Sequence, residues 1–203
     1  MIMKTSIIKI VAFLLVSAGF TASAQMLDSA TLATKPVYTN LAEALKNPDK
    51  VYRLNLRHQK LKKIPDGVFT LTNLQELNLS KNKLKSIPRD IAKLKNLEIL
   101  NLSSNKLDSL CPEIGQLVNI KRLILNQNVI NFLPASISNL TKMYFLDMWG
   151  NNIQSLPKEI VKLKSTLKTI DFRVISIKEN DQEDMEALLP NTKIFFSTSC
   201  NCQ

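Results

Sequence analysis

The chain has 203 residues and a formal net charge of +10, from 27 lysines and arginines against 17 aspartates and glutamates. It holds one histidine, His58, and no Ser-His-Asp, Cys-His or metal-ligand set can be assembled around it. We therefore expect no enzyme, no cofactor and no bound metal. The positive charge could draw the protein to acidic polymers, or the lysines could simply keep a leucine-rich surface soluble.

Residues 1–24 have the pattern of a secretory signal. Two lysines precede a short apolar stretch over residues 10–20, and the small-x-small sequence Ala-Ser-Ala ends at residue 24. The apolar stretch is far shorter than the roughly 20 residues that a membrane span needs. We predict cleavage before Gln25, no integral membrane segment in the mature protein, and export to the periplasm, the cell surface or the surroundings. Export makes nucleic acid a poor candidate partner.

Residues 25–39 are small and polar without any period, so we expect a flexible leader. Residues 40–50 form the predicted N-terminal cap. Asn40 and Glu43 have the spacing of a capping box, in which each side chain bonds the other residue's backbone N–H. A short helix to about Lys46 follows, and Asn47-Pro48 stops it. This helix should cover the open first rung of a repeat array.

Residues 51–175 repeat one pattern every 23 residues, and such a fixed period is typical of a solenoid. The copies begin at Val51, Leu74, Leu97, Ile120 and Met143, with a sixth at Leu167 after a one-residue insertion. A Leu-x-Leu pair in each copy alternates inward and outward, as a strand does. Asparagine recurs at the next inward position, at 82, 105, 128 and 151, where a buried amide can bond backbone groups left by a sharp turn. We predict a structural role for these asparagines.

Residues 176–203 are predicted to close the array as a C-terminal cap and tail. Asn180 and Glu183 suggest a second capping box for a helix to about Leu189, and Ile194 and Phe196 suggest a closing strand. The roles of the three cysteines are left open by the sequence. Cys111 lies about 19 Å from the C-terminal end at roughly 4.8 Å per rung, too far for a disulfide unless the tail folds back. Cys200 and Cys202 could form a strained ring, bridge to another chain, hold a metal, or have no chemical role.

The pattern LxxLxLxxNxLxxLPxxIxxLxN, as in residues 74–96, resembles the 23-residue, proline-containing leucine-rich repeat. The resemblance covers about residues 51–197, and the flanks look similar to the caps of exported bacterial repeat proteins. The Ala-Gln cleavage site also looks like that of Bacteroidota. The resemblance implies an α/β fold: a curved solenoid with a parallel sheet on its concave face, a helical N-terminal cap and a helix-strand C-terminal cap. It also implies binding of proteins or glycans, without naming the ligand.

Outward residues of the strands define three columns on the concave face. The first column is Arg53, Glu76, Ile99, Arg122, Phe145 and Thr169. The second is Asn55, Asn78, Asn101, Ile124, Asp147 and Asp171, and the third is Arg57, Ser80, Ser103, Asn126, Trp149 and Arg173. Apart from Ile99, repeats one to three show mostly small polar groups, whereas apolar and aromatic groups gather in repeats four and five. We expect Trp149 to be exposed there unless it packs under the C-terminal cap or in a homodimer. The predicted partner-binding residues are Ile99, Arg122, Ile124, Asn126, Tyr144, Phe145, Asp147, Trp149 and Arg173.

A lysine edge is the second candidate surface, made of Lys60, Lys62, Lys83, Lys85 and Lys106. These lysines either form a solvated edge or bind an anionic partner. Asp147 and Asp171, one rung apart, could have the spacing of retaining glycosidases, yet nothing predicts a deep pocket around them. We predict a non-enzymatic module that recognises a protein partner. The alternative is an envelope or surface structural protein that associates with acidic polysaccharide through the lysine edge. The sequence leaves the oligomeric state open.

Overall fold

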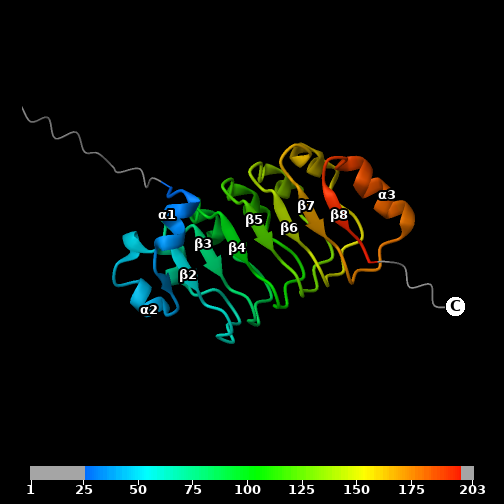
Figure 1. The fold of residues 1–203 in the computed structure, drawn as a ribbon. Helices are drawn as coiled ribbons and strands as arrows, with labels where there is room; N and C mark the ends of the chain where they lie inside the picture. Colours follow the sequence, from blue (N-terminus) through cyan, green and yellow to red (C-terminus); the bar gives the residue numbers. More distant parts are fainter. Residues whose placement is uncertain (1–25, 198–203) are drawn as a thin grey trace, which may run out of the picture.

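The computed structural model describes residues 26–197, so the signal segment, Cys200 and Cys202 lie outside the described residues. Eight strands form one parallel sheet in chain order, which bends into the curved solenoid shown in Figure 1. The strands are β1 (Val37–Tyr38), β2 (Arg53–Asn55), β3 (Glu76–Asn78), β4 (Ile99–Asn101), β5 (Arg122–Ile124), β6 (Phe145–Asp147), β7 (Thr169–Asp171) and β8 (Lys193–Phe195). The predicted α/β repeat solenoid is confirmed.

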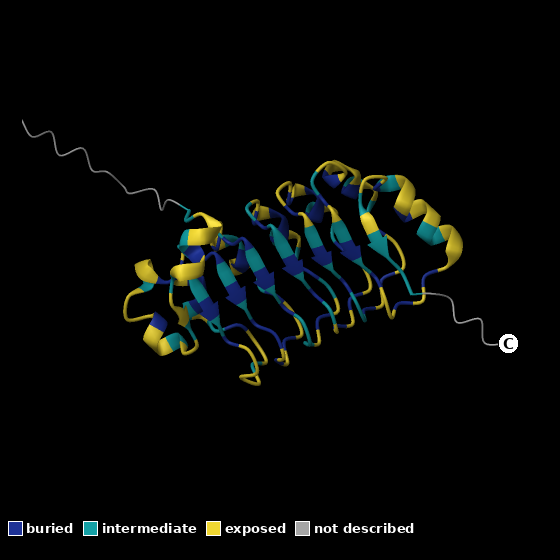
Figure 2. Ribbon diagram, in the orientation of Figure 1, coloured by how far each residue is buried: buried dark blue, intermediate teal, exposed yellow. Residues whose placement is uncertain are grey.

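The strand register follows the 23-residue period. Leu77 pairs with Leu54 on one side and Leu100 on the other, and all three are buried. Figure 2 shows buried and half-buried residues alternating along strands β2 to β7, which sets one face of the sheet against the core. Burial of each such leucine contributes roughly 1.5–3 kcal/mol. The expected first and second columns of outward residues are therefore confirmed by the pairing.

Short 3-10 helices return the chain along the convex side, opposite the sheet. Each places one buried residue of the series Val68, Ile91, Ile114, Ile137 and Ile160 against the core. Their bounds are η2 (Asp66–Thr70), η3 (Arg89–Lys93), η4 (Pro112–Gln116), η5 (Ala135–Asn139) and η6 (Lys158–Leu163).

The asparagine ladder forms as predicted. Asn128 accepts a hydrogen bond from the Leu107 N–H at 3.0 Å, and its Nδ2 donates to the carbonyls of Leu125 and Leu102 at 2.8 and 3.1 Å. Asn82, Asn105 and Asn151 repeat this arrangement. In the first rung Gln59 is exposed, and its side chain bonds the Thr39 carbonyl instead. The buried amides thus join each rung to the next.

The expected flexible leader is wrong, because residues 29–38 are folded. Helix α1 (Ser29–Thr34) starts at Asp28, whose carboxylate accepts hydrogen bonds from two backbone N–H groups of the first turn. Leu32 is buried, and β1 pairs with β2. The side-chain amide of Gln75 holds Leu27 by two hydrogen bonds, at 2.8 and 2.9 Å. The segment is therefore folded although its composition is mostly polar, because buried Leu32, the strand pairing and these hydrogen bonds hold it to the first repeats.

Of the two predicted capping boxes, the first forms in part and the second does not form. Helix α2 (Leu41–Ala44) is capped by the Asn40 side chain as expected, but Glu43 pairs with Lys46 rather than closing the box. It ends just before the short helix η1 (Pro48–Lys50). Helix α3 (Glu179–Leu188) starts without any side-chain cap, so its capping box is wrong. Gln182 at that turn donates to the Ile177 carbonyl at 2.8 Å instead.

The C-terminal cap is a helix and a strand, as predicted. Met185 of α3 and Leu189 are buried, and β8 pairs with β7 at the end of the sheet. Phe172 and Phe196 stack with ring centroids 6.1 Å apart. Among residues 26–197, no helix has the length and apolar character needed to cross a membrane.

Candidate functional site

The register brings the apolar residues of the first column together. Ile99, Arg122 and Phe145 occupy paired positions on β4, β5 and β6, and all three are half-buried. The Arg122 guanidinium lies 5.2 Å from the centroid of the Phe145 ring, within the range of a cation–π contact. The three residues therefore form a continuous surface with one positive charge at its centre. Their part in partner binding stays a prediction.

The second column has a structural role that the sequence analysis missed. In five of its rungs an Asn or Asp side chain accepts a hydrogen bond from the backbone N–H two residues later. The residues are Asn55, Asn78, Asn101, Asp147 and Asp171, with distances of 2.9–3.2 Å. This Asx turn satisfies the backbone where each strand ends. Its signal in the sequence was the recurrence itself, since a ligand site has no need to repeat in every rung.

Ile124 interrupts this column in repeat four. Its side chain cannot accept a hydrogen bond, so rung four gives up the strand-end contact and exposes part of an apolar group instead. Asn126, two residues later, uses its side chain to donate to Oδ2 of Asp147 at 2.5 Å. Ile124 lies diagonally between Ile99 and Phe145 on the same face of the sheet. The apolar surface is thus widest at repeat four.

Asp147 and Asp171 do not form a catalytic pair. Both oxygens of Asp147 are engaged by Asn126 and by the Trp149 N–H, and both oxygens of Asp171 accept from the Arg173 guanidinium. Burial raises the pKa of Asp147 despite those hydrogen bonds. Burial also acts to raise the pKa of Asp171, but the hydrogen bonds and charge of Arg173 outweigh it and lower that pKa. The pKa values of the two carboxyl groups shift in opposite directions because Asp171 pairs with the cationic Arg173, whereas Asp147 accepts hydrogen bonds from neutral groups.

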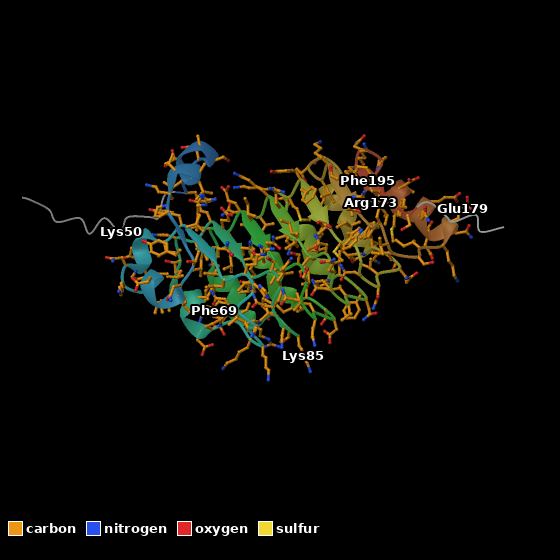
Figure 3. All side chains as sticks on the ribbon, turned by 60° about the horizontal axis from the view of Figure 1, so that its bottom comes forward. Lys50, Phe69, Lys85, Arg173, Glu179 and Phe195 are labelled. Atoms are coloured by element: carbon orange, nitrogen blue, oxygen red, sulfur yellow. The ribbon has the colours of Figure 1, made fainter. Side chains whose placement is uncertain are left out.

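Trp149 is less exposed than expected, and Arg173 is exposed as expected but has partners within the chain. Trp149 is half-buried rather than exposed. Among the predicted partner-binding residues the exposed aromatic is Tyr144, just before β6, with 44% of its surface accessible. The Arg173 guanidinium lies 5.6 Å from the Phe195 ring centroid, and Figure 3 shows the two side by side. Arg173 is therefore engaged with the C-terminal cap as well as with Asp171.

A groove beside α1 extends the concave site toward the N-terminus, and the sequence analysis missed it because α1 was not expected. It encloses about 280 Å³. Leu32 and Ala33 of α1 form one wall, and Ile99 and Tyr144 form the other. Two ion pairs line the space between them, Arg53 with Glu76 at 2.6 Å and Lys121 with Glu98 at 2.8 Å. The charges at the bottom of the groove are therefore balanced.

The lysine edge forms where the strands turn toward the convex side. Backbone hydrogen bonds from Lys83 to Leu61 and from Lys106 to Leu84, at 2.7 and 2.8 Å, hold successive rungs in register. All five lysines are exposed, and none takes part in an ion pair among residues 26–197. Lys85 projects from the rim that Figure 3 brings forward. The backbone register thus places Lys83 and Lys106 on neighbouring rungs, and the role of the five lysines as a polyanion-binding edge stays a prediction.

The cysteine in the third rung is half-buried and free. Burial, with the nearby charge of Glu113, raises the pKa of the Cys111 thiol, so the thiol form dominates at neutral pH. No group of three or more His, Cys, Asp or Glu residues within the described chain is placed to hold a metal ion. The described residues thus offer neither a reactive thiolate nor a ligand cluster.

Comparison with known proteins agrees with this geometry. A Leucine rich repeat family model matches residues 49–107 and 95–153, together more than half of the chain. A leucine-rich repeat protein of Leptospira interrogans is 32% identical, with a TM-score of 0.64, and the match covers 80% of this chain and 53% of that one. No curated protein matches the sequence.

Two plant structures are also similar. The leucine-rich repeat ectodomain of the membrane receptor kinase GASSHO1/SCHENGEN3 from Arabidopsis thaliana, solved in complex with Casparian strip integrity factor 2, is 28% identical. Its TM-score is 0.59, over 73% of this chain and 18% of the ectodomain. A plant ice-binding protein, 24% identical with a TM-score of 0.56 over 74% of this chain and 50% of that one, shares the fold.

This chain spans about half the length of the Leptospira protein, so it matches a part of that relative. Proteins of this repeat class are typically non-enzymatic scaffolds for protein interaction. The 23-residue period, the in-register parallel strands and these matches show that the chain belongs to the leucine-rich repeat family.

Proposed function

We propose that the chain is an exported, non-enzymatic binding module that recognises a protein partner through repeats three to five of its concave face. The contact surface, called the concave patch, consists of Ile99, Arg122, Ile124, Tyr144, Phe145 and Trp149. The observation that carries the proposal is Ile124. It replaces the hydrogen-bonding residue found at that position in the other five rungs from β2 to β7.

The isoleucine at position 124 gives up a strand-end hydrogen bond that the neighbouring rungs keep. A hydrogen bond of this kind contributes roughly 0.5–1.5 kcal/mol. Rung four forgoes it and leaves apolar surface partly open to water. Departures from a local structural rule are expected at functional sites. An apolar surface beside aromatic and arginine side chains has the composition of a protein-binding hot spot.

The neighbouring groove indicates what part of a partner would bind. Its ion pairs are satisfied internally, so it offers no net charge to an incoming segment. Arg122 has no ion-pair partner among the described residues, and its cation is held over Phe145. We therefore expect a partner segment with apolar side chains for the groove and an acidic group for Arg122. The complexed plant ectodomain supports the use of this fold in recognition.

Ile124→Asn separates binding from folding. Asparagine at this position can restore the strand-end hydrogen bond while removing the apolar side chain, so the variant should be as stable as the wild type or more so. A partner captured from the surroundings of the natural host should be retained by the wild type and lost by this variant and by Phe145→Ala/Trp149→Ala. Val129→Asn, on the same rung at an exposed position outside the patch, is the matched control and should retain the partner.

Equal retention by wild type and Ile124→Asn would refute the concave patch. Export has a separate test, because cleavage before Gln25 gives the mature protein a defined start. Mass spectrometry of protein purified from its natural host should find Gln25 as the first residue. Intact protein starting at Met1 would contradict export by this signal.

A further inference from the structure

A second surface lies on the rim of the solenoid, apart from the concave patch. We propose that the lysine edge binds a linear acidic polysaccharide, whose chain runs across the rungs of repeats one to three. This inference does not depend on the proposed protein partner. It follows from the spacing, the exposure and the local composition of the edge.

The lysines of the edge are held at the spacing of the rungs. The backbone hydrogen bonds that link Lys83 to Leu61 and Lys106 to Leu84 set Lys83 and Lys106 on successive rungs, and the 23-residue period assigns Lys60 to the rung before them. Neighbouring rungs lie roughly 4.8 Å apart, so the like charges that they carry repel one another. A polymer with a regular series of negative charges would relieve this repulsion along the whole row. A small anion would relieve it at one rung only.

Positive charge is concentrated in the first three repeats of this rim and is interrupted over repeats four and five; the aligned segment of repeat six, residues 173–179, carries Arg173 and Lys178 beside Glu179. Residues 57–63 and 80–86, which read RHQKLKK and SKNKLKS, contain no acidic residue. Residues 103–109 read SSNKLDS, and their one acid, Asp108, accepts a hydrogen bond from the Ser109 hydroxyl. The aligned segments of repeats four and five, 126–132 and 149–155, read NQNVINF and WGNNIQS and carry no charge at all. The charge is thus a stripe of limited length, not a general property of the surface.

The chemistry of the stripe favours polysaccharide over other polyanions. Single-stranded nucleic acid is held by aromatic side chains on which bases stack, and the three charged segments contain no phenylalanine, tyrosine or tryptophan. Stable attachment to a membrane surface takes an apolar anchor in addition to basic residues, and the half-buried Leu61 packs against the core instead. Lysine is a compact point charge without the fork geometry of arginine. A row of lysines therefore suits a polymer that is recognised by the spacing of its negative charges, without directional hydrogen bonds.

The test compares two triple variants with the same change in net charge. Lys60/Lys83/Lys106→Gln removes one cation from each rung of the stripe, and Lys95/Lys162/Lys164→Gln removes three exposed cations elsewhere. Binding of fluorescent polygalacturonate would be measured by anisotropy over a range of salt concentrations. We expect at least about a tenfold loss of affinity for the edge variant at low salt and little change for the control. The slope of log K against log salt should fall by about 2, taking roughly 0.7 per neutralised charge.

Equal losses in both variants would overturn the inference, since net charge alone would then explain binding. Tighter binding to anionic lipid vesicles or to single-stranded DNA than to polygalacturonate would overturn it as well, as would no binding by the wild type. Ile124→Asn should retain full polysaccharide affinity. Retention there, with loss in the edge variant, would show that the stripe acts independently of the concave patch.

Discussion

Removal of a ladder asparagine should be among the most destabilising single changes in this chain. In Asn128→Ala the buried Leu107 N–H loses its side-chain partner, and such an orphaned donor costs roughly 1–3 kcal/mol. The carbonyls of Leu102 and Leu125 each lose one hydrogen bond but keep another, from Asn105 and Asn151 respectively. Those two losses add roughly 0.5–1.5 kcal/mol each. We expect a total loss of about 2–6 kcal/mol.

The measurement is equilibrium urea unfolding followed by circular dichroism. Asn96→Ala is the matched control, because its side chain donates one exposed hydrogen bond, to the Thr72 carbonyl at 3.0 Å. That change should cost about 1 kcal/mol or less. If Asn128→Ala cost no more than Asn96→Ala, the buried ladder would not be a source of stability, and the repeat would depend on its leucines alone.

Three further changes test other parts of the fold by the same unfolding measurement. Val174→Gly should stabilise the protein by about 1 kcal/mol, because this exposed β-branched residue has a left-handed φ of +61°, whereas Val129→Gly should not stabilise it. Gly115→Ala should destabilise the protein by roughly 1–3 kcal/mol, because an added Cβ would clash with the backbone oxygen of Ser136 on the next rung. Equal stability of this variant and the wild type would show that the two rungs can move apart there. Asp147→Asn should gain in stability over the wild type as pH rises above about 4. The raised pKa of Asp147 makes its ionisation more costly in the folded state than in the unfolded state, and a pH-independent difference would contradict that assignment.

The sequence predicted the repeat architecture well because one physical requirement recurs in every rung. A leucine at the wrong phase would leave the core, so the 23-residue period determines the strand register that pairs Leu77 with Leu100. The ladder asparagines were predictable for the same reason. Turn geometry exposes the same backbone groups in each copy, and Asn128 and its equivalents meet that need.

The ends and the concave face were less predictable because they depend on contacts between distant residues. Helix α1 is held by Leu32 and by the contact from Gln75 to Leu27, 48 residues away in the chain, which no local pattern reveals. Asp28 before the helix was the one local signal, as an N-cap. The column that contains Asn78 and Asp147 was assigned to the surface correctly, but its recurrence should have indicated the strand-end hydrogen bond.

In a solenoid of this kind, the residues that break the repeat are the ones that call for an explanation beyond the fold. Asn101 and Asp147 on either side of Ile124 keep the strand-end hydrogen bond, so the neighbouring rungs show what rung four gives up. The rim of repeats one and two is cationic, whereas the aligned segments of repeats four and five, residues 126–132 and 149–155, carry no charge. Each departure lies within a larger surface of one chemical kind. The concave patch is apolar and aromatic, and the lysine edge is cationic, so the two surfaces suit different ligands and can be tested by separate variants.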